Sequence, residues 1–313
     1  MTLDRPSVFD ALVVGGGPAG LSAATWLGRY RSSTLVVDAG RQRNLSADHS
    51  HGLLGRDPTT PQELLTDAHA GLEQYPEVML RHGSVTAVHQ SDEGLFRATV
   101  DGAAVFAKRM VLATGMRDQL PELAGFHAHY GTDVFHCPAC DGYNAREQTV
   151  IVLGSGDQLP AYAAELLDWA VAVRMITGTD GESVDDEQRA VLGGQGIEVV
   201  DGVAEALVGP PGSLRGVRLA GGRLVEGDQV FFSHGHHPLN VLGHQLGCRL
   251  DHEGRIAVDD FQLTSVDGVY AAGDITAGFQ LIPVAMGEGT TAGVACATSL
   301  RGDSGTSAAS RPE

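Results

Sequence analysis

Two cysteines separated by two residues, Cys137 and Cys140, are the first feature of the sequence that could do chemistry. A two-residue spacer can bring two sulfurs within disulfide reach in a tight turn, and thiols in such motifs often have a lowered pKa. The thiolate is the reacting form, so a neighbouring acid or base controls the direction of thiol exchange. His136 and Asp141, which flank the pair, are the two local candidates for proton transfer. The pattern predicts redox chemistry at this pair.

Two other interpretations of the pair remain open. A structural zinc site needs four ligands, usually from a second Cys-x-x-Cys or from a His pair at matching spacing. Cys248 and Cys296 are isolated in the sequence and are most simply small buried apolar residues. The second alternative is an inert turn with two buried thiols. We expect no metal, and we interpret the histidines at positions 234, 236 and 237 as part of a polar loop.

A glycine loop near the N-terminus carries the pattern of a dinucleotide-binding turn. Residues 15–20 read Gly-Gly-Gly-Pro-Ala-Gly, and the pattern G-x-G-x-x-G falls on Gly15, Gly17 and Gly20. These glycines allow a tight turn, close approach of the backbone to a pyrophosphate, and close packing of helix on strand. Pro18 and Ala19 open the helix, whose N-terminal N–H groups favour phosphate. Asp38 follows about 20 residues later, where a carboxylate can accept hydrogen bonds from a ribose hydroxyl.

Two further glycine turns distinguish FAD from a nicotinamide cofactor. A strand expected around 108–115 ends in the glycine turn Ala113-Thr114-Gly115, and residues 269–274 form another strand-to-glycine junction that ends in Gly273-Asp274. An extended FAD needs additional backbone contacts and a carboxylate near its ribityl chain or pyrophosphate, and Asp274 is the candidate. Together the three turns predict FAD.

The expected elements describe an α/β fold with two Rossmann-like dinucleotide-binding domains. The first βαβ unit has strands at 9–14 and 34–38 around a helix at 20–30. The pattern restarts with a strand at 149–153, a turn at 154–156, a helix at 160–169 and a strand at 171–176. We therefore expect a discontinuous FAD-binding domain at 1–116 and 245–313. An inserted NAD(P)H-like domain with the redox pair would occupy 117–244.

Composition excludes several other classes. The formal net charge of −18 argues against nucleic acid, since phosphate binding needs clustered Lys and Arg. No apolar run is long enough to span a bilayer. The first ten residues lack the layout of a signal peptide, so a cytoplasmic protein is expected. A C-terminal helix is expected from about residue 284, and the Ser/Gly/Ala-rich residues from Arg301 on are expected to be disordered.

Taken together, these motifs resemble the low-molecular-weight thioredoxin reductase family. The resemblance covers nearly the whole chain and includes the three glycine turns above, the glycine turn at Gly154, the segment 137–142 and the segment 235–238. It implies a homodimer that holds FAD on a domain made from both chain ends. It also implies that Cys140 lies nearest the flavin, that Cys137 reacts with substrate, and that Asp141 is the acid/base.

The inserted domain departs from the pattern of family members that use NADPH. Leu159 and Pro160 stand where a small residue would let the helix approach the glycine turn. After the next strand comes Thr-Gly-Thr-Asp at 177–180, with no Arg or Lys to hold a 2′-phosphate. Asp157 and Asp180 would repel such a phosphate. NADPH binding is therefore doubtful, although Asp180 could serve a ribose hydroxyl of NADH.

A subgroup with the same loss is the dithiol oxidases resembling those of gliotoxin and holomycin biosynthesis. The run from Arg43-Asn44 to Gly55, which includes His49 and His51, looks like that subgroup, and Asn44 is a candidate cofactor contact. For the two histidines, a polar loop and a role near the flavin both stay open. The fungal members differ at the position of Asp141, so the choice between Asp141 and His136 as the base stays open too.

Three functions follow from these observations. The first is a dithiol oxidase, in which a small-molecule dithiol reduces the Cys137–Cys140 disulfide, the thiolate of Cys140 reduces FAD, and dioxygen takes the electrons. The second is a disulfide reductase of the thioredoxin type, fed by NAD(P)H or by reduced ferredoxin. The third is a non-catalytic flavin-bound regulator that uses the thiols as a redox sensor.

Overall fold

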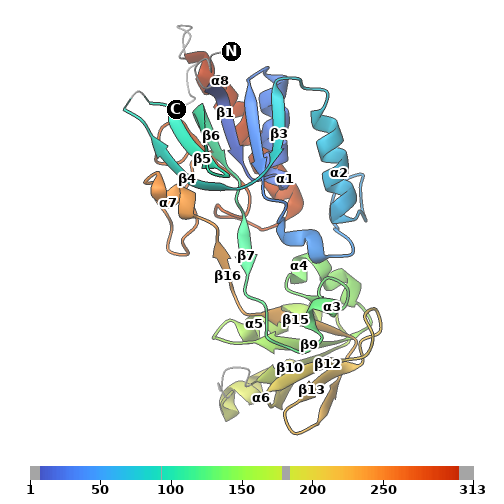
Figure 1. Ribbon diagram of the computed structural model, residues 1–313. Coiled ribbons are helices and arrows are strands. Elements are labelled where there is room, and N and C mark those ends of the chain that lie inside the picture. Colours follow the sequence, from blue (N-terminus) through green and yellow to red (C-terminus); the bar gives the residue numbers. More distant parts are fainter. Residues whose placement is uncertain (1–7, 93, 178–183, 303–313) are drawn as a thin grey trace. The chain divides into compact units, whose positions relative to one another are not determined.

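The computed structural model describes residues 8–92, 94–177 and 184–302 (Figure 1). By its internal contacts the chain divides into two compact units. Unit 1 comprises Met1–Leu45, Gln62–Arg117 and His237–Glu313, and unit 2 comprises Ser46–Pro61 and Asp118–His236. The chain leaves unit 1 in β7 (Met116–Asp118) and returns in β16 (His236–Pro238), and these two strands pair with each other.

Unit 1 is built on a seven-stranded mixed sheet in the order β3-β2-β1-β6-β5-β4, with β17 also paired to β6. The strands are β1 (Val8–Val14), β2 (Thr34–Asp38), β3 (Val78–His82), β4 (Val85–Gln90), β5 (Phe96–Val100), β6 (Ala103–Leu112) and β17 (Val269–Ala271). The first part of β6 pairs with β5 in antiparallel fashion, and its last three residues pair with β17 in parallel. Successive residues of β1 enter opposite cores, since Val13 lies in one apolar cluster and Leu12 and Val14 in another. This two-sided burial is typical of a central parallel strand.

The helices of unit 1 are α1 (Pro18–Arg29), α2 (Pro61–Leu72), α7 (Val241–Gln245) and α8 (Ile282–Gly302), with a short 3₁₀ turn at Arg43–Ser46. Figure 1 shows α8, near the C-terminal end of the chain, beside α1 near its start. Gly289 and Gly293 let the two helices approach closely: a Cβ at either position would stand 2.1 and 2.5 Å from the carbonyl oxygens of Ala19 and Ala23. The Ser22 hydroxyl also donates to the Met286 carbonyl oxygen at 2.7 Å.

Unit 2 contains a five-stranded parallel sheet in the order β11-β10-β9-β15-β8. These strands are β8 (Val134–Phe135), β9 (Thr149–Gly154), β10 (Ala172–Thr177), β11 (Ile197–Asp201) and β15 (Gln229–Ser233). Val150 and Val152 of β9 face one apolar cluster, while Ile151 and Leu153 face the other. The central strand of this unit is therefore buried on both faces, like β1 in unit 1.

The remaining elements of unit 2 cover this sheet. They are α3 (Phe126–His129), α4 (Pro138–Asp141), a 3₁₀ turn at Gly142–Ala145, α5 (Leu159–Glu165), a 3₁₀ turn at Leu166–Asp168 and α6 (Asp186–Gly194). A separate antiparallel sheet joins β12 (Ala204–Val208), β13 (Gly216–Leu219) and β14 (Leu224–Glu226).

The predicted fold class, α/β with two Rossmann-like units, is confirmed by these two sheets. The units differ from the expected domain limits at two places. Residues 46–61, expected in the FAD-binding domain, pack with unit 2, where Asp48 donates its N–H to the Gly131 carbonyl oxygen at 3.1 Å. The chain returns to unit 1 after His236 rather than after residue 244.

The expectation for the C-terminus was partly wrong. The last helix begins at Ile282 and continues through Arg301 and Gly302. The Arg301 guanidinium lies 5.0 Å from the centre of the Tyr30 ring, a cation–π contact that holds the end of the helix. Residues 303–313, where disorder was also expected, lie outside the described residues.

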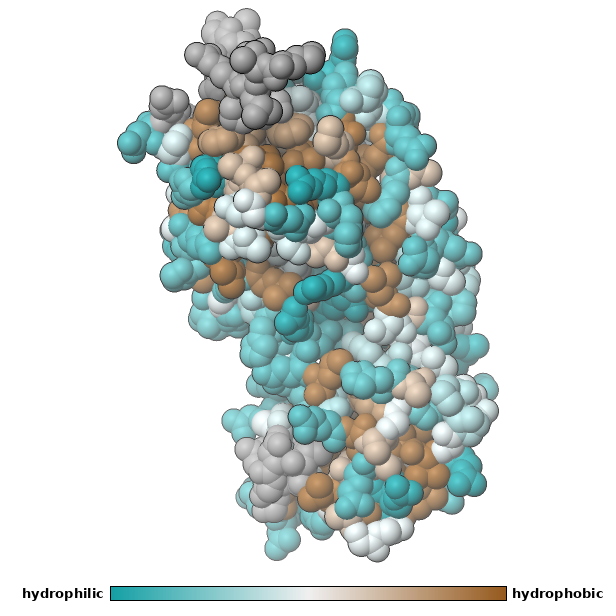
Figure 2. Space-filling view, viewed as in Figure 1, coloured by the Kyte–Doolittle hydropathy of each residue, from teal (hydrophilic) through white to brown (hydrophobic). Residues whose placement is uncertain are grey.

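The face of the molecule drawn in Figure 2 carries mixed teal and brown areas. Several large apolar side chains are exposed, among them Leu54, Phe279, Val171 and Val241. Within the described part of the chain, no helix combines the length and apolar character needed to cross a membrane.

Candidate functional site

The glycine loop of unit 1 opens α1 without a side-chain cap. Gly17 is the N-cap residue, Pro18 stands at the first helical position, and no side chain of the described residues caps the first turn. A Cβ on Gly17 would meet only the Gln42 side chain, at 3.8 Å, so space is open beside the backbone. Gly20 is closed in, because a Cβ there would lie 1.9 Å from the Gly15 carbonyl oxygen. An uncapped helix start with an open approach fits the pyrophosphate of FAD.

Asp38 lies at the end of β2 and reaches back to this loop. Its carboxylate accepts hydrogen bonds from the backbone N–H of Gly16 at 3.3 Å and of Gly40 at 3.0 Å, and from Gln42 Nε2 at 2.8 Å. Gly16 has to be glycine here, because a Cβ would lie 2.4 Å from Asp38 Cγ. Gln42, which the sequence analysis missed, holds Asp38 at the position expected for a ribose contact.

The other two glycine turns belong to the same unit. In the turn after β6, Thr114 Oγ1 donates to the Leu239 carbonyl oxygen at 2.8 Å, and Gly115, with φ +69°, accepts from the Leu239 N–H at 2.9 Å. Ala113 closes against Gly15, since a Cβ on Gly15 would lie 2.2 Å from the Ala113 carbonyl oxygen. Asn44 lies in the 3₁₀ turn at Arg43–Ser46.

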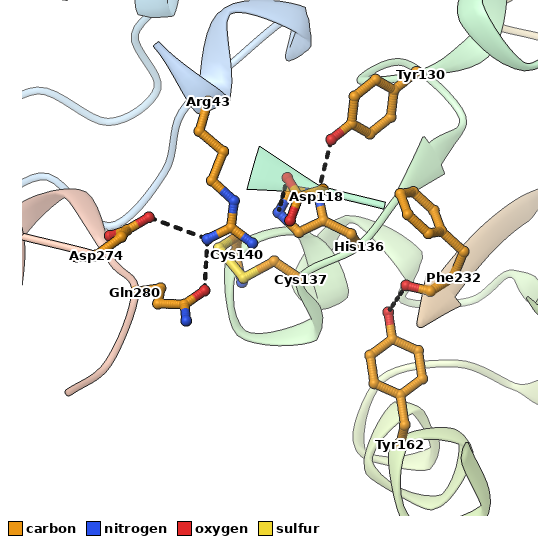
Figure 3. Close-up of a disulfide and its surroundings, with 10 residues drawn as sticks. All are labelled: Arg43, Asp118, Tyr130, His136, Cys137, Cys140, Tyr162, Phe232, Asp274 and Gln280. Carbon is orange, nitrogen blue, oxygen red and sulfur yellow. Dashed lines mark hydrogen bonds and ion pairs between the residues drawn. A yellow bond between two sulfur atoms is a disulfide. The ribbon is translucent and has the colours of Figure 1, made fainter. Parts of the chain in front are cut away.

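The Gly273-Asp274 turn follows β17 and is fixed by two side chains from distant parts of unit 1. Glu288 of α8 accepts the Gly273 N–H at 2.7 Å, and burial raises the pKa of Glu288 above its ordinary value despite this hydrogen bond. Arg43 Nη1 lies 3.0 Å from Asp274 Oδ2 and also donates to Gln280 Oε1 (Figure 3). The positive charge offsets the carboxylate at the place where the phosphates of FAD are expected.

The redox pair lies in unit 2, at the carboxyl end of β8. Cys137 and Cys140 form a disulfide with an S–S distance of 2.05 Å and a Cα–Cα distance of 5.3 Å (Figure 3). Cys137 is the N-cap of α4, and its Sγ accepts the Cys140 N–H at 3.2 Å. Gly142 closes the turn against the Trp169 ring, which a Cβ would approach to 2.6 Å. The prediction that this spacing permits a disulfide is confirmed.

The other two cysteines are buried and free, as the sequence suggested. Burial raises the pKa of the Cys296 thiol to about 12 and also raises that of Cys248, so neither is a reactive thiolate at neutral pH. Among the residues that the structure describes, no group of three His, Cys, Asp or Glu side chains is arranged to hold a metal ion.

His136 is oriented by neighbours on both sides. Its Nδ1 lies 3.2 Å from the Tyr130 hydroxyl, and its Nε2 lies 3.7 Å from Asp118 Oδ2 (Figure 3). The centre of its ring lies 6.0 Å from the centre of the Phe232 ring. Asp118 and Tyr130 come from the segment before β8 and were missed by the sequence analysis. Only the tertiary structure brings them to the residue that precedes Cys137.

Asp141, at the end of α4, has a different environment. Burial raises the pKa of the Asp141 carboxyl to about 6, and the positive charge of a protonated His51 lowers it in part. A carboxyl with a pKa near 6 exchanges protons at physiological pH, which suits a general acid/base. The structure thus places both candidate proton-transfer residues in unit 2 with the cysteine pair.

The second glycine turn, after β9, has the Leu159 side chain packed beside its first glycine. A Cβ on Gly154 would lie 2.7 Å from Leu159 Cδ1, and Leu159 itself is buried. Pro160 stands in the first turn of α5, which has seven residues and no side-chain cap at Gln158. Asp157 remains in the turn, whereas Asp180 lies outside the described residues. The bulky residue that departs from the family pattern therefore packs against the first glycine of the turn, whereas a Cβ on Gly156 would meet nothing within 4 Å.

Comparison with known proteins decides the family. The family described as pyridine nucleotide-disulphide oxidoreductase matches residues 9–289 of the chain. The chain belongs to this family. It is therefore an oxidoreductase enzyme, and FAD is its cofactor.

The oxidoreductase is similar over its whole length to proteins named thioredoxin reductase, which confirms the family resemblance expected from the motifs. It is 29% identical to thioredoxin reductase tcpT of Claviceps purpurea (strain 20.1), over 96% of this chain and 97% of that protein. It is 28% identical to thioredoxin reductase sirT of Leptosphaeria maculans, over 92% and 93% of the two chains.

Solved structures give the same relationship. The crystal structure of HlmI aligns with a TM-score of 0.88 and 33% identity, covering 95% of this chain and 93% of that one. An oxidoreductase from Agrobacterium tumefaciens aligns with a TM-score of 0.84 and 33% identity, covering 94% and 99%.

Proposed function

We propose that this oxidoreductase is a dithiol oxidase, which closes an intramolecular disulfide in a small sulfur-containing metabolite with dioxygen as the electron acceptor. The observation that carries the proposal is the contrast between the two halves of unit 2. The Cys137–Cys140 disulfide is formed, whereas the second glycine turn has the bulky Leu159 side chain packed beside Gly154, where family members that use NADPH carry a small residue. A thiol donor needs the disulfide and does not need a turn that binds NADPH.

Electrons and protons balance in the following way. A substrate thiol gives its proton to the Asp141 carboxylate, and the resulting thiolate attacks Cys137 Sγ. The Cys137–Cys140 bond breaks, with its electron pair on Cys140 Sγ. The second substrate thiol then attacks the substrate sulfur of this mixed disulfide, and its proton passes to the released Cys137 Sγ. The products are a substrate disulfide and a reduced cysteine pair, after transfer of two electrons and two protons.

FAD bound to this protein would supply a two-electron acceptor for the reduced cysteine pair and a route for those electrons to dioxygen. The residues proposed to hold it lie in unit 1, at or just after the carboxyl ends of β1, β2, β6 and β17: Gly15, Gly17, Pro18, Ala19, Gly20, Asp38, Asn44, Ala113, Thr114, Gly115, Gly273 and Asp274. Unit 1 is thus proposed as the FAD-binding domain and unit 2 as a degenerate nicotinamide domain. A cytoplasmic homodimer is part of the same proposal and rests on the family resemblance.

Anaerobic mixing of the FAD-loaded protein with single donors tests the proposal. The donors are dithiothreitol, NADPH, NADH and reduced ferredoxin. Reduction of the flavin is followed as the loss of its absorbance at roughly 450 nm. We expect bleaching by the dithiol and recovery in air with formation of hydrogen peroxide. Rapid bleaching by NADPH, NADH or ferredoxin without reaction with the dithiol would instead identify a disulfide reductase.

A set of cysteine variants separates an enzyme from a redox sensor. C137S and C140S each remove one sulfur of the pair, and C248A removes a buried cysteine outside it. We expect aerobic dithiol turnover to fall by about 10³-fold or more in the first two and to persist in C248A. Equal, negligible turnover in the wild type and all three variants would favour a non-catalytic sensor.

A further inference from the structure

The segment 46–61 forms a closed loop on unit 2 that carries a histidine. Ser50 and Thr59 exchange backbone hydrogen bonds of 2.7 and 3.2 Å and close the loop at its base. Within it, Asp57 Oδ2 accepts the Gly52 N–H at 2.9 Å. His51 is thereby held at a defined place in the loop.

His51 is clamped through both ring nitrogens. Nδ1 lies 2.9 Å from Asp57 Oδ1, and Nε2 lies 3.1 Å from the side-chain nitrogen of Asn144. Asp57 can only accept while it is ionised, so Nδ1 carries a proton. The Asn144 amide serves both states of the ring: its N–H₂ donates to the bare Nε2 of neutral His51, and its oxygen, after a flip, accepts from the protonated Nε2.

Asp57 is well suited to hold this histidine. The hydrogen bond from the Gly52 backbone, followed by that from His51, holds the pKa of Asp57 below its ordinary value. Asp57 therefore stays ionised over the working pH range and accepts the proton on His51 Nδ1. The dyad is partly exposed, since 29% of the His51 side chain and 46% of the Asp57 side chain are accessible to solvent.

The Asp141 carboxyl depends on this histidine for its electrostatic environment. No hydrogen bond to this carboxyl comes from the residues that the structure describes, and protonated His51 is the charge that opposes the effect of burial. Tyr162 also interacts electrostatically with Asp141, but its hydroxyl donates to the Phe232 carbonyl oxygen at 3.1 Å. Burial, then Glu165 and Asp141, raise the pKa of Tyr162, so it remains neutral.

The titratable groups around His51 and Asp141 come from three segments of unit 2. The loop 46–61 supplies His51, Asp57 and His49, whose ring centre lies 6.3 Å from that of His51. Helix α5 supplies Tyr162 and Glu165. Helix α4 supplies Asp141, directly after Cys140.

We propose that His51, positioned between Asp57 and Asn144, controls when Asp141 carries a proton and therefore the pH range in which the cysteine pair exchanges thiols. This inference rests on the proposed function for the role of Asp141 and adds a positioning residue to it. While His51 is protonated, its charge keeps Asp141 ionised and ready to accept the proton of the incoming substrate thiol.

Nuclear magnetic resonance of ¹⁵N/¹³C-histidine-labelled, FAD-loaded protein tests the geometry without any substrate. The His51 signals are assigned by their absence in H51N. We expect neutral His51 to carry its proton on Nδ1. We also expect the pH at which His51 gains its second proton to fall by about one unit in D141N, since the coupling between two sites is reciprocal. A proton on Nε2 in the neutral ring, or an unchanged titration in D141N, would overturn the proposal.

The rate of anaerobic flavin reduction by dithiothreitol, measured from roughly pH 4.5 to 8, gives the functional readout, because carboxyl and imidazole groups titrate in this range. The inflection of this rate profile at low pH reports the ionisation of Asp141. In H51N we expect this inflection to move to higher pH by about one unit, because the positive charge that opposes burial is lost. D57N moves it in the same direction by a smaller amount and keeps the side-chain shape. H127N, which changes an exposed histidine elsewhere in unit 2, is the control and leaves this inflection in place.

The two arms separate this inference from the proposed function. If no dithiol reduces the wild-type flavin at any pH, the dithiol oxidase is excluded, while the magnetic resonance result still decides the coupling of His51 and Asp141. If dithiols reduce the flavin but the inflection stays in place in both H51N and D57N, the proposed function stands and the role of His51 is excluded.

Discussion

Arg43 and Asp274 form an ion pair of 3.0 Å that joins positions 231 residues apart in the chain. Both side chains are largely buried, with 15% and 20% of their surfaces exposed. The pair connects the loop after β2 to the glycine turn after β17, so it fixes two of the segments proposed to surround FAD. It also neutralises a carboxylate that would otherwise repel the phosphates of the cofactor.

Replacing Arg43 should therefore weaken FAD binding. In R43Q the Asp274 carboxylate loses its cation, and we expect the Kd for FAD to rise about tenfold, which corresponds to roughly 1.4 kcal/mol. Fluorescence titration of the apoprotein with FAD gives the value. R41Q, an exposed arginine two residues earlier, is the control and should bind FAD as the wild type does. Equal affinities in R43Q and R41Q would contradict the proposed role.

The contiguous motifs were readable from the sequence because the backbone itself imposes them. Gly15 and Gly20 are required by close contacts inside one turn, and the spacing of Cys137 and Cys140 alone allows a disulfide. The pattern of buried strands gave the two Rossmann-like units for the same reason, since a strand such as β1 is apolar on both faces.

The supporting side chains could not be predicted in this way. Glu288 reaches Gly273 from a helix, and His51 meets Asn144 across 93 residues of chain. Charged and polar residues at such positions look like ordinary surface residues in a sequence, because only the folded chain shows which backbone N–H or side chain they meet. The placement of residues 46–61 in unit 2 was missed for the same reason.

The close contact of α8 with α1 predicts opposite effects for two neighbouring glycines. In G289A the new Cβ would lie 2.1 Å from the Ala19 carbonyl oxygen, so the helices must separate at the start of α1. We expect a loss of about 1–3 kcal/mol in the free energy of unfolding, together with weaker FAD binding. In G287A the Cβ meets nothing within 4 Å, and the variant should be neutral or stabilised by up to about 1 kcal/mol. Thermal unfolding of the two variants side by side provides the comparison.

The elevated pKa of Asp141, about 6, predicts the pH dependence of the reaction with dithiols. Asp141 acts as a base only when ionised, so the rate of flavin reduction should rise with pH through an inflection near 6. The substrate thiols add a separate rise near their own pKa of about 8.5. In D141N we expect the lower inflection to vanish and the rate at pH 7 to fall by about 10²-fold. Stopped-flow profiles of both proteins test this, and an inflection near 6 that survives in D141N would assign it to His136 or another group.

Asp10 at the start of the unit 1 sheet predicts a change of stability with pH. Its carboxylate accepts hydrogen bonds from Lys108 Nζ at 2.8 Å and from the Ser33 N–H and hydroxyl at 2.9 and 3.0 Å. Burial alone would raise the pKa of Asp10, but these hydrogen bonds outweigh it, and the pKa lies below its ordinary value. A carboxyl with a lowered folded-state pKa stabilises the protein above its unfolded pKa of about 3.9. That stabilisation is lost as the pH falls through the folded-state value.

We therefore expect D10N to lower the free energy of unfolding by about 1–2 kcal/mol at pH 7, or the Tm by about 2–4 °C. Below about pH 4 the difference from the wild type should shrink, because the wild-type carboxylate is then becoming protonated. D260N, which changes an exposed aspartate of the same unit, controls for the loss of one negative charge. Calorimetry at a series of pH values measures all three proteins. A D10N effect that persists unchanged at low pH would mean that packing around Asp10, rather than its charge, stabilises this part of the sheet.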